Sequence, residues 1–138
     1  MKAIRTISKC LLSFLMVAAG IMHFVKHSFF VKIVPPYLPF PSELVVLSGL
    51  CEICLGILLL IPPFSRFAAW GIIALLVTVF PANIFLYQHQ EIVPASPTVH
   101  FIRLILQGPL ILWAYWHTKT ASTSALLQTS EVERPGRD

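Results

Sequence analysis

Four long apolar segments constrain what this chain can fold into. They are separated by short connections and cover residues 8–25, 43–61, 65–87 and 97–117. A membrane-spanning helix needs about 20 mostly apolar residues, and a helix satisfies its own backbone hydrogen bonds inside a bilayer. Short connections place consecutive helices antiparallel. The pattern therefore predicts an all-α, integral membrane four-helix bundle over residues 1–117.

The composition agrees with a membrane protein. The 138 residues are 57% hydrophobic and 12% charged, whereas a typical soluble domain has about 25% charged residues. The net charge is +4, but most basic residues lie outside the apolar segments, so we expect no nucleic-acid partner. The start of the chain resembles a signal peptide as far as Gly20. Because the apolar character continues to Val25, we expect an uncleaved membrane helix.

Lys and Arg residues predict the orientation, because cytoplasmic loops of membrane proteins carry an excess of them. Five lie on one predicted side and two on the other: Lys2, Arg5, Lys9, Arg66 and Lys119, against Lys26 and Lys32. We therefore expect both termini in the cytoplasm. The polar residues 118–138 are expected to form a disordered cytoplasmic tail.

The first connection, about residues 26–42, is unusual because it contains the stretch VPPYLPFP. Proline fixes φ and removes a backbone donor, and it pushes the preceding residue toward extended conformations. The connection is also too apolar for a free linker. It is predicted to be a stiff, non-helical lid that packs at the outer membrane surface.

Each apolar segment has a narrow polar or small face. In chain order these faces hold Gly20, His23 and His27; Ser48, Gly49, Glu52 and Gly56; Thr78 and Asn83; and His100, Arg103 and Gln107. Ionisable residues inside membrane spans usually face the bundle interior and mark functional sites. A rise of about 1.5 Å per residue places five of them at similar depths in the outer half of the membrane. These candidate ligand-binding residues are His23, Glu52, Asn83, Arg103 and Gln107.

Away from the segment ends, Glu52 and Arg103 are the only Asp, Glu, Lys or Arg residues in the four segments. A lone buried charge is costly, but an opposite partner offsets the cost, and the guanidinium fork suits a carboxylate. The sequence therefore predicts a Glu52–Arg103 pair flanked by the other three. Two alternatives stay open: the pair fixes helix register only, or Asn83 caps a carbonyl freed by Pro81.

Two cysteines flank Glu52, and three glycines are expected to let helices approach closely. Cys51 and Cys54 lie inside a predicted helix in apolar surroundings, where burial suppresses thiol reactivity, so we interpret them as packing residues rather than a redox pair. The predicted helix-packing positions are Gly20, Gly49 and Gly56. The spacing of Cys and His residues predicts no metal site.

The chain resembles the DoxX family of small four-helix bacterial membrane proteins. The resemblance covers about residues 10–117 and rests on AGIMHF (19–24), VPPYLP (34–39), SGLCEICLG (48–56), FPANIF (80–85) and RLILQGPL (103–110). It puts these residues on the family's polar and small positions: Gly20, His23, Gly49, Glu52, Pro81, Asn83, Arg103 and Gln107. The resemblance implies a multi-pass protein of the bacterial inner membrane. Some members of the family are linked to quinone-dependent oxidoreductase complexes.

Three functions are consistent with these features. The first is a membrane subunit of a quinone-linked oxidoreductase complex, in which the polar site binds the quinone and a protein partner or second copy completes the assembly. The second is a non-enzymatic scaffold or assembly factor. The third, which four short helices without inverted repeats favour least, is a small-solute or proton-coupled transporter.

Overall fold

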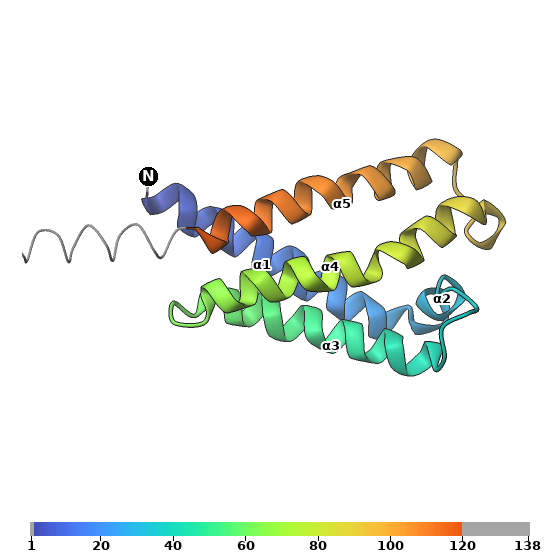
Figure 1. The fold of residues 1–138 in the computed structure, drawn as a ribbon, viewed down its shortest axis with the longest axis horizontal. Coiled ribbons are helices and arrows are strands. Elements are labelled where there is room, and N and C mark those ends of the chain that lie inside the picture. The colour runs from blue at the N-terminus through green and yellow to red at the C-terminus, as the bar shows by residue number, and fades with distance from the viewer. Residues whose placement is uncertain (1, 120–138) are drawn as a thin grey trace, which may run out of the picture.

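The computed structural model describes residues 2–119, and the regular elements in that range are all helical (Figure 1). They are α1 (Lys2–Val25), α2 (His27–Lys32), α3 (Pro41–Leu60), α4 (Ser65–Gln88), the 3-10 helix η1 (Gln90–Ile92) and α5 (Pro97–Thr118). The helices α1, α3 and α4 contain segments long and apolar enough to cross a membrane. These observations confirm the prediction of an all-α fold for the described residues. They also confirm that the chain has helices long and apolar enough to span a membrane, three rather than four by this measure. The helix α5 has a similar length of 22 residues but is not among the three helices that are apolar enough.

The helix boundaries differ from the prediction at two places. The first helix begins at Lys2, six residues earlier than expected, because Ala3 to Ile7 carry no Gly or Pro that would stop it. The predicted non-helical lid contains the short helix α2, and this part of the prediction was wrong. The prolines of the connection begin at Pro35, so the preceding stretch HSFFVK is free to form a helical turn. Apart from Thr118 and Lys119, the predicted tail lies outside the described residues.

Prolines mark several helix ends. Pro41 and Pro97 occupy the first turns of α3 and α5, where the missing N–H needs no intrahelical partner. The helix α3 stops before Pro62, and Ile61 is extended, as a residue before proline prefers. Phe40, directly before α3, has the left-handed φ of 55°, which costs energy in a non-glycine residue.

The long helices pack as two pairs, α1 with α3 and α4 with α5, which meet along α3 and α4 (Figure 1). The helix α5 approaches α1 at one end, which we call the terminal end. There Trp113 Nε1 donates to Ser8 Oγ at 2.7 Å, and His117 Nε2 lies 3.1 Å from the same oxygen. Toward the opposite end, which holds α2 and is called the α2 end, α5 diverges from α1 (Figure 1).

The main apolar core lies among α1, α3, α4 and α5. It consists of Leu12, Met16, Leu59, Ala68, Ala69, Ile72, Leu76 and Ala114. No member of this cluster lies in the last two turns of α1 or the first four turns of α5. The α2 end of the bundle is therefore held by other contacts, which include buried apolar side chains such as Ile33, Val45 and Leu86.

The helices α1 and α3 approach closely through glycine. A Cβ on Gly20 would lie 2.6 Å from the Gly49 carbonyl oxygen, and one on Gly49 would lie 2.8 Å from His23 Cβ. Ser13 Oγ donates to the Gly56 carbonyl at 2.6 Å, one further contact between the same helices. All three glycines that the sequence assigned to helix packing therefore lie in the α1–α3 contact.

Candidate functional site

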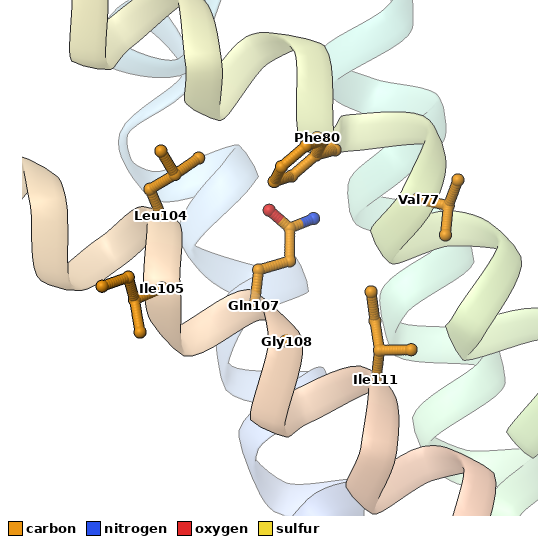
Figure 2. Close-up of a pocket in the computed structure, with 7 residues that line it drawn as sticks. All are labelled: Val77, Phe80, Leu104, Ile105, Gln107, Gly108 and Ile111. Atoms are coloured by element: carbon orange, nitrogen blue, oxygen red, sulfur yellow. The ribbon is translucent and has the colours of Figure 1, made fainter.

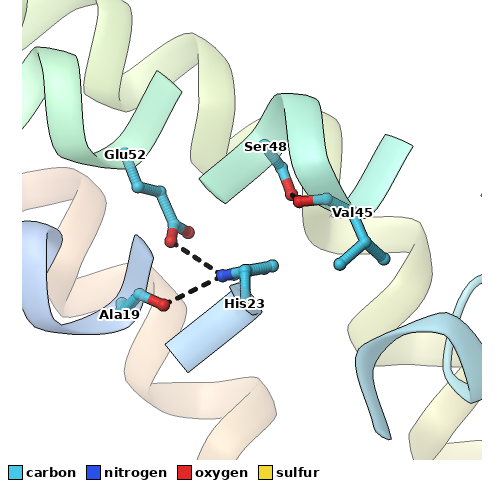
Figure 3. A network of polar contacts seen from close by, with 5 residues as sticks. All are labelled: Ala19, His23, Val45, Ser48 and Glu52. Carbon is cyan, nitrogen blue, oxygen red and sulfur yellow. Dashed lines mark hydrogen bonds and ion pairs between the residues drawn. The ribbon is translucent and has the colours of Figure 1, made fainter. Parts of the chain in front are cut away.

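A half-buried histidine and a buried glutamate form a pair between α1 and α3 (Figure 3). His23 Nδ1 lies 3.1 Å from Glu52 Oε2 and 2.9 Å from the carbonyl oxygen of Ala19. Glu52 is 7% exposed. A carbonyl can only accept a hydrogen bond, so Nδ1 carries a proton, which it donates to the Ala19 carbonyl, while Glu52 Oε2 lies at ion-pair distance from the same nitrogen. The backbone of α1 thereby sets the tautomer of His23.

This tautomer determines where the pair can exchange a proton. With Nδ1 protonated, the other ring nitrogen, Nε2, is the position that gains or loses a proton as the imidazole changes charge. Phe30 of α2 stacks on the His23 ring, with centroids 4.0 Å apart and planes 24° apart. The pair can therefore hold one mobile proton beside a carboxylate, under a cover supplied by α2.

The predicted Glu52–Arg103 pair is wrong, because Glu52 pairs with His23 instead. The reason is the order of the helices. The helix α5, which carries Arg103, packs on α4 and diverges from α1 at the α2 end (Figure 1). Arg103 is half-buried.

Asn83 and Gln107 form a second polar pair, which joins α4 to α5. Asn83 Nδ2 donates to Gln107 Oε1 at 2.9 Å, and Gln107 Nε2 donates to the Leu76 carbonyl. Pro81 has no N–H and disturbs the hydrogen bonds of the preceding turn of α4. Gln107, which is buried, therefore supplies a donor to the α4 backbone near the proline.

We expect Gln107→Leu to destabilise the α4–α5 contact by about 1–2 kcal/mol, because the Leu76 carbonyl and the Asn83 amide lose their partner while both stay partly buried. The measurement is the thermal unfolding midpoint of the purified protein in detergent. Gln90→Leu, at an exposed amide donor of η1, is the matched control. Equal midpoints for the two variants would contradict this assignment.

A groove of about 480 Å³ lies beside this pair, lined by Val77, Phe80, Leu104, Ile105, Gln107, Gly108 and Ile111 (Figure 2). Its lining is apolar except for Gln107, whose amide already bonds within the chain. A Cβ on Gly108 would meet no atom within 4 Å. The groove thus offers room but no unused polar group among these lining residues.

The five predicted site residues do not form one interaction network. His23 contacts Glu52 and Asn83 bonds Gln107, while Arg103 has no described contact with the other four. The cysteines beside Glu52 are both free thiols, with Cys54 exposed and Cys51 half-buried. Within residues 2–119, no three His, Cys, Asp or Glu side chains lie close enough to hold a metal ion.

Sequence reasoning left two buried groups out of the site. His100 is 2% exposed, and its Nε2 donates to the Val93 carbonyl at 3.1 Å. Its spacing from Gln107 already placed it on the inward face of α5. The contact of Ser8 with Trp113 and His117 had no comparable signal, since Ser8 is the first residue of an apolar segment.

Apolar helices of membrane-spanning length, joined by buried polar pairs, define a small helical membrane protein. The chain belongs to the family described as a domain of unknown function, DUF8561, whose sequence model matches residues 12–118. That range contains both polar pairs and Arg103. No curated protein is significantly similar to the chain. No solved structure is significantly similar either.

Proposed function

We propose that the chain is a DoxX-like integral membrane subunit of a quinone-linked oxidoreductase complex, in which His23 and Glu52 bind the quinone and handle its protons. The observation that carries this proposal is the His23–Glu52 pair itself, which puts an ionisable imidazole beside a carboxylate between apolar helices. Asn83 and Gln107 take a structural part, because their amides already bond within the chain.

The chemistry of a quinone suits this pair. Reduction to the quinol takes up two electrons and two protons at the carbonyl oxygens. A protonated His23 can donate from Nε2 to such an oxygen, and the Glu52 carboxylate stabilises the imidazolium before transfer. No metal-ligating group of three side chains occurs in residues 2–119, so we assign the delivery of electrons to a partner subunit.

The proposal includes a topology. We propose that α5 is a fourth membrane span and that the protein lies in a bacterial inner membrane, with both termini in the cytoplasm. The α2 end then faces the outside, and Phe30 covers His23 from that side. Two features support α5 as a span: its length of 22 residues and the bonding of Gln107 inside the bundle.

The test is the quinone content of the protein purified with native lipids, measured by solvent extraction and redox difference spectra. We expect quinone to co-purify with the wild type and its retained amount to fall about tenfold in His23→Gln, since a charged hydrogen bond is lost. His89→Gln is the control. His89 Nδ1 also bonds a carbonyl four residues back, that of Phe85, but forms no described ion pair. Absence of quinone from the wild type, or equal loss in both variants, would refute the proposal.

A second candidate is a non-enzymatic scaffold or assembly factor. It is favoured by the Asn83–Gln107 pair, which uses its hydrogen-bonding capacity to hold two helices together. If the scaffold function is correct, replacing His23 alone lowers the abundance of the protein. Replacing both His23 and Glu52 by apolar residues then restores that abundance and leaves the host complex active. A stable but inactive double variant would instead favour the quinone-linked function.

A further inference from the structure

Arg103 has no partner within residues 2–119. It makes no hydrogen bond, ion pair or aromatic contact there, although its side chain is half-buried. A guanidinium stays charged and carries five N–H donors. A charge in such surroundings is expensive unless acceptors surround it. The position therefore calls for an acceptor that the described chain does not supply.

The helix packing explains why Glu52 does not reach Arg103. Glu52 is held by His23 on the other helix pair, and α5 diverges from α1 at the α2 end (Figure 1). Arg103 lies four residues before Gln107 on α5, so both occupy one face. Gln107 is buried, which directs this face toward the bundle rather than away from it.

A second side chain on the same face has one nitrogen without a partner. His100, three residues before Arg103, is 2% exposed, and its Nε2 donates to the Val93 carbonyl. Its Nδ1 is buried without a hydrogen-bond partner among the described residues. In the neutral ring Nδ1 is a lone-pair acceptor, and in the imidazolium it is a donor. Residues three apart are neighbours on a helix surface.

We propose that Arg103 and His100 form a binding site for an oxyanion, such as a phosphate, at the α2 end of α5. The guanidinium supplies paired N–H donors to two anionic oxygens. In the neutral ring, His100 Nδ1 accepts a hydrogen bond from a protonated oxygen of the ligand. In the imidazolium, Nδ1 donates to an anionic oxygen of the ligand. Each unpartnered group thereby gains a partner. The site is separate from the His23–Glu52 pair and does not depend on quinone binding.

The oxyanion has two possible sources, a phospholipid headgroup and free phosphate. Arg103 lies six residues into α5, about 9 Å along the helix axis at the usual rise. A long arginine side chain can extend over much of that distance toward a membrane surface. Free phosphate would instead enter from the solution at the α2 end. Both sources present the same anionic oxygens.

The experiment measures binding to the full chain purified in a maltoside detergent, which contains no phosphate. In one arm, phosphatidylglycerol is titrated while the thermal midpoint and the lipid retained in native mass spectrometry are followed. In the other arm, sodium phosphate is titrated against sodium chloride of equal ionic strength. We expect saturable stabilisation of the wild type in one arm, which identifies the source, and about tenfold weaker binding by Arg103→Gln.

Arg66→Gln is the matched control, because it removes the same charge from an exposed position at the start of α4. It is expected to bind like the wild type. If Arg103→Gln does not fold, Arg103→Lys serves, since it keeps the charge but loses the paired donors and should bind more weakly. The proposal is overturned if neither ligand stabilises the wild type, or if the Arg103 variant that folds binds both ligands as the wild type does.

Discussion

His23→Leu is expected to lower the free energy of unfolding by roughly 3–5 kcal/mol, because it leaves the buried Glu52 carboxylate without its partner. Removing both partners together costs far less, since a buried pair replaced by apolar residues of similar volume is often neutral. The double variant His23→Leu with Glu52→Met should therefore recover most of the loss. The measurement is reversible unfolding in mixed micelles, analysed as a double-mutant cycle.

The control for this cycle is His89→Leu. His89 resembles His23 in bonding a carbonyl four residues back and in contacting a phenylalanine ring, Phe85 at 4.2 Å. It forms no ion pair with a described residue. We expect His89→Leu to cost much less than His23→Leu. Equal costs, or additive effects of the His23 and Glu52 changes, would show that the pair contributes no specific coupling.

Gly20→Ala is expected to destabilise the protein by about 3 kcal/mol, the upper part of the usual range for overpacking. The new methyl group would lie 2.6 Å from the backbone oxygen of Gly49 and 2.7 Å from Ile53 Cγ1. A backbone atom cannot rotate away, so α1 and α3 must separate. That movement should also lengthen the His23–Glu52 contact and, under the proposed function, weaken quinone retention.

The same substitution at Gly108 provides the control. A Cβ there meets nothing within 4 Å, and alanine favours a helix over glycine by up to about 1 kcal/mol. Gly108→Ala should therefore leave the thermal midpoint unchanged or raise it slightly. If Gly20→Ala and Gly108→Ala behave alike, close approach of α1 and α3 does not hold the bundle together.

The sequence predicts the helices well because each carries its own signal. Long apolar runs and prolines at helix ends depend on neighbouring residues alone, and α3, α4 and α5 lie within two residues of the expected bounds. The helix α2 was missed because the prolines of its connection dominate the local pattern. A run as short as HSFFVK has little periodicity of its own.

The partners of polar residues were harder to predict than their faces. The spacing correctly put Gln107 on a buried face, but periodicity carries no information about which helix that face meets. Pairing Glu52 with Arg103 assumed that all four faces converge at one depth. In the structure α4 separates α5 from α3, so the carboxylate meets the imidazole on α1 instead.

The two helix pairs also bear on how the chain enters a membrane. Helices are synthesised in chain order, and the His23–Glu52 contact is complete once α3 has emerged. The Asn83–Gln107 contact joins the next two helices in the same way. In the proposed four-span topology, each half of the protein can thus partition into lipid as a hairpin whose polar pair has already formed. The Glu52 carboxylate therefore does not have to stay without a partner in the hydrocarbon region until the C-terminal half is synthesised.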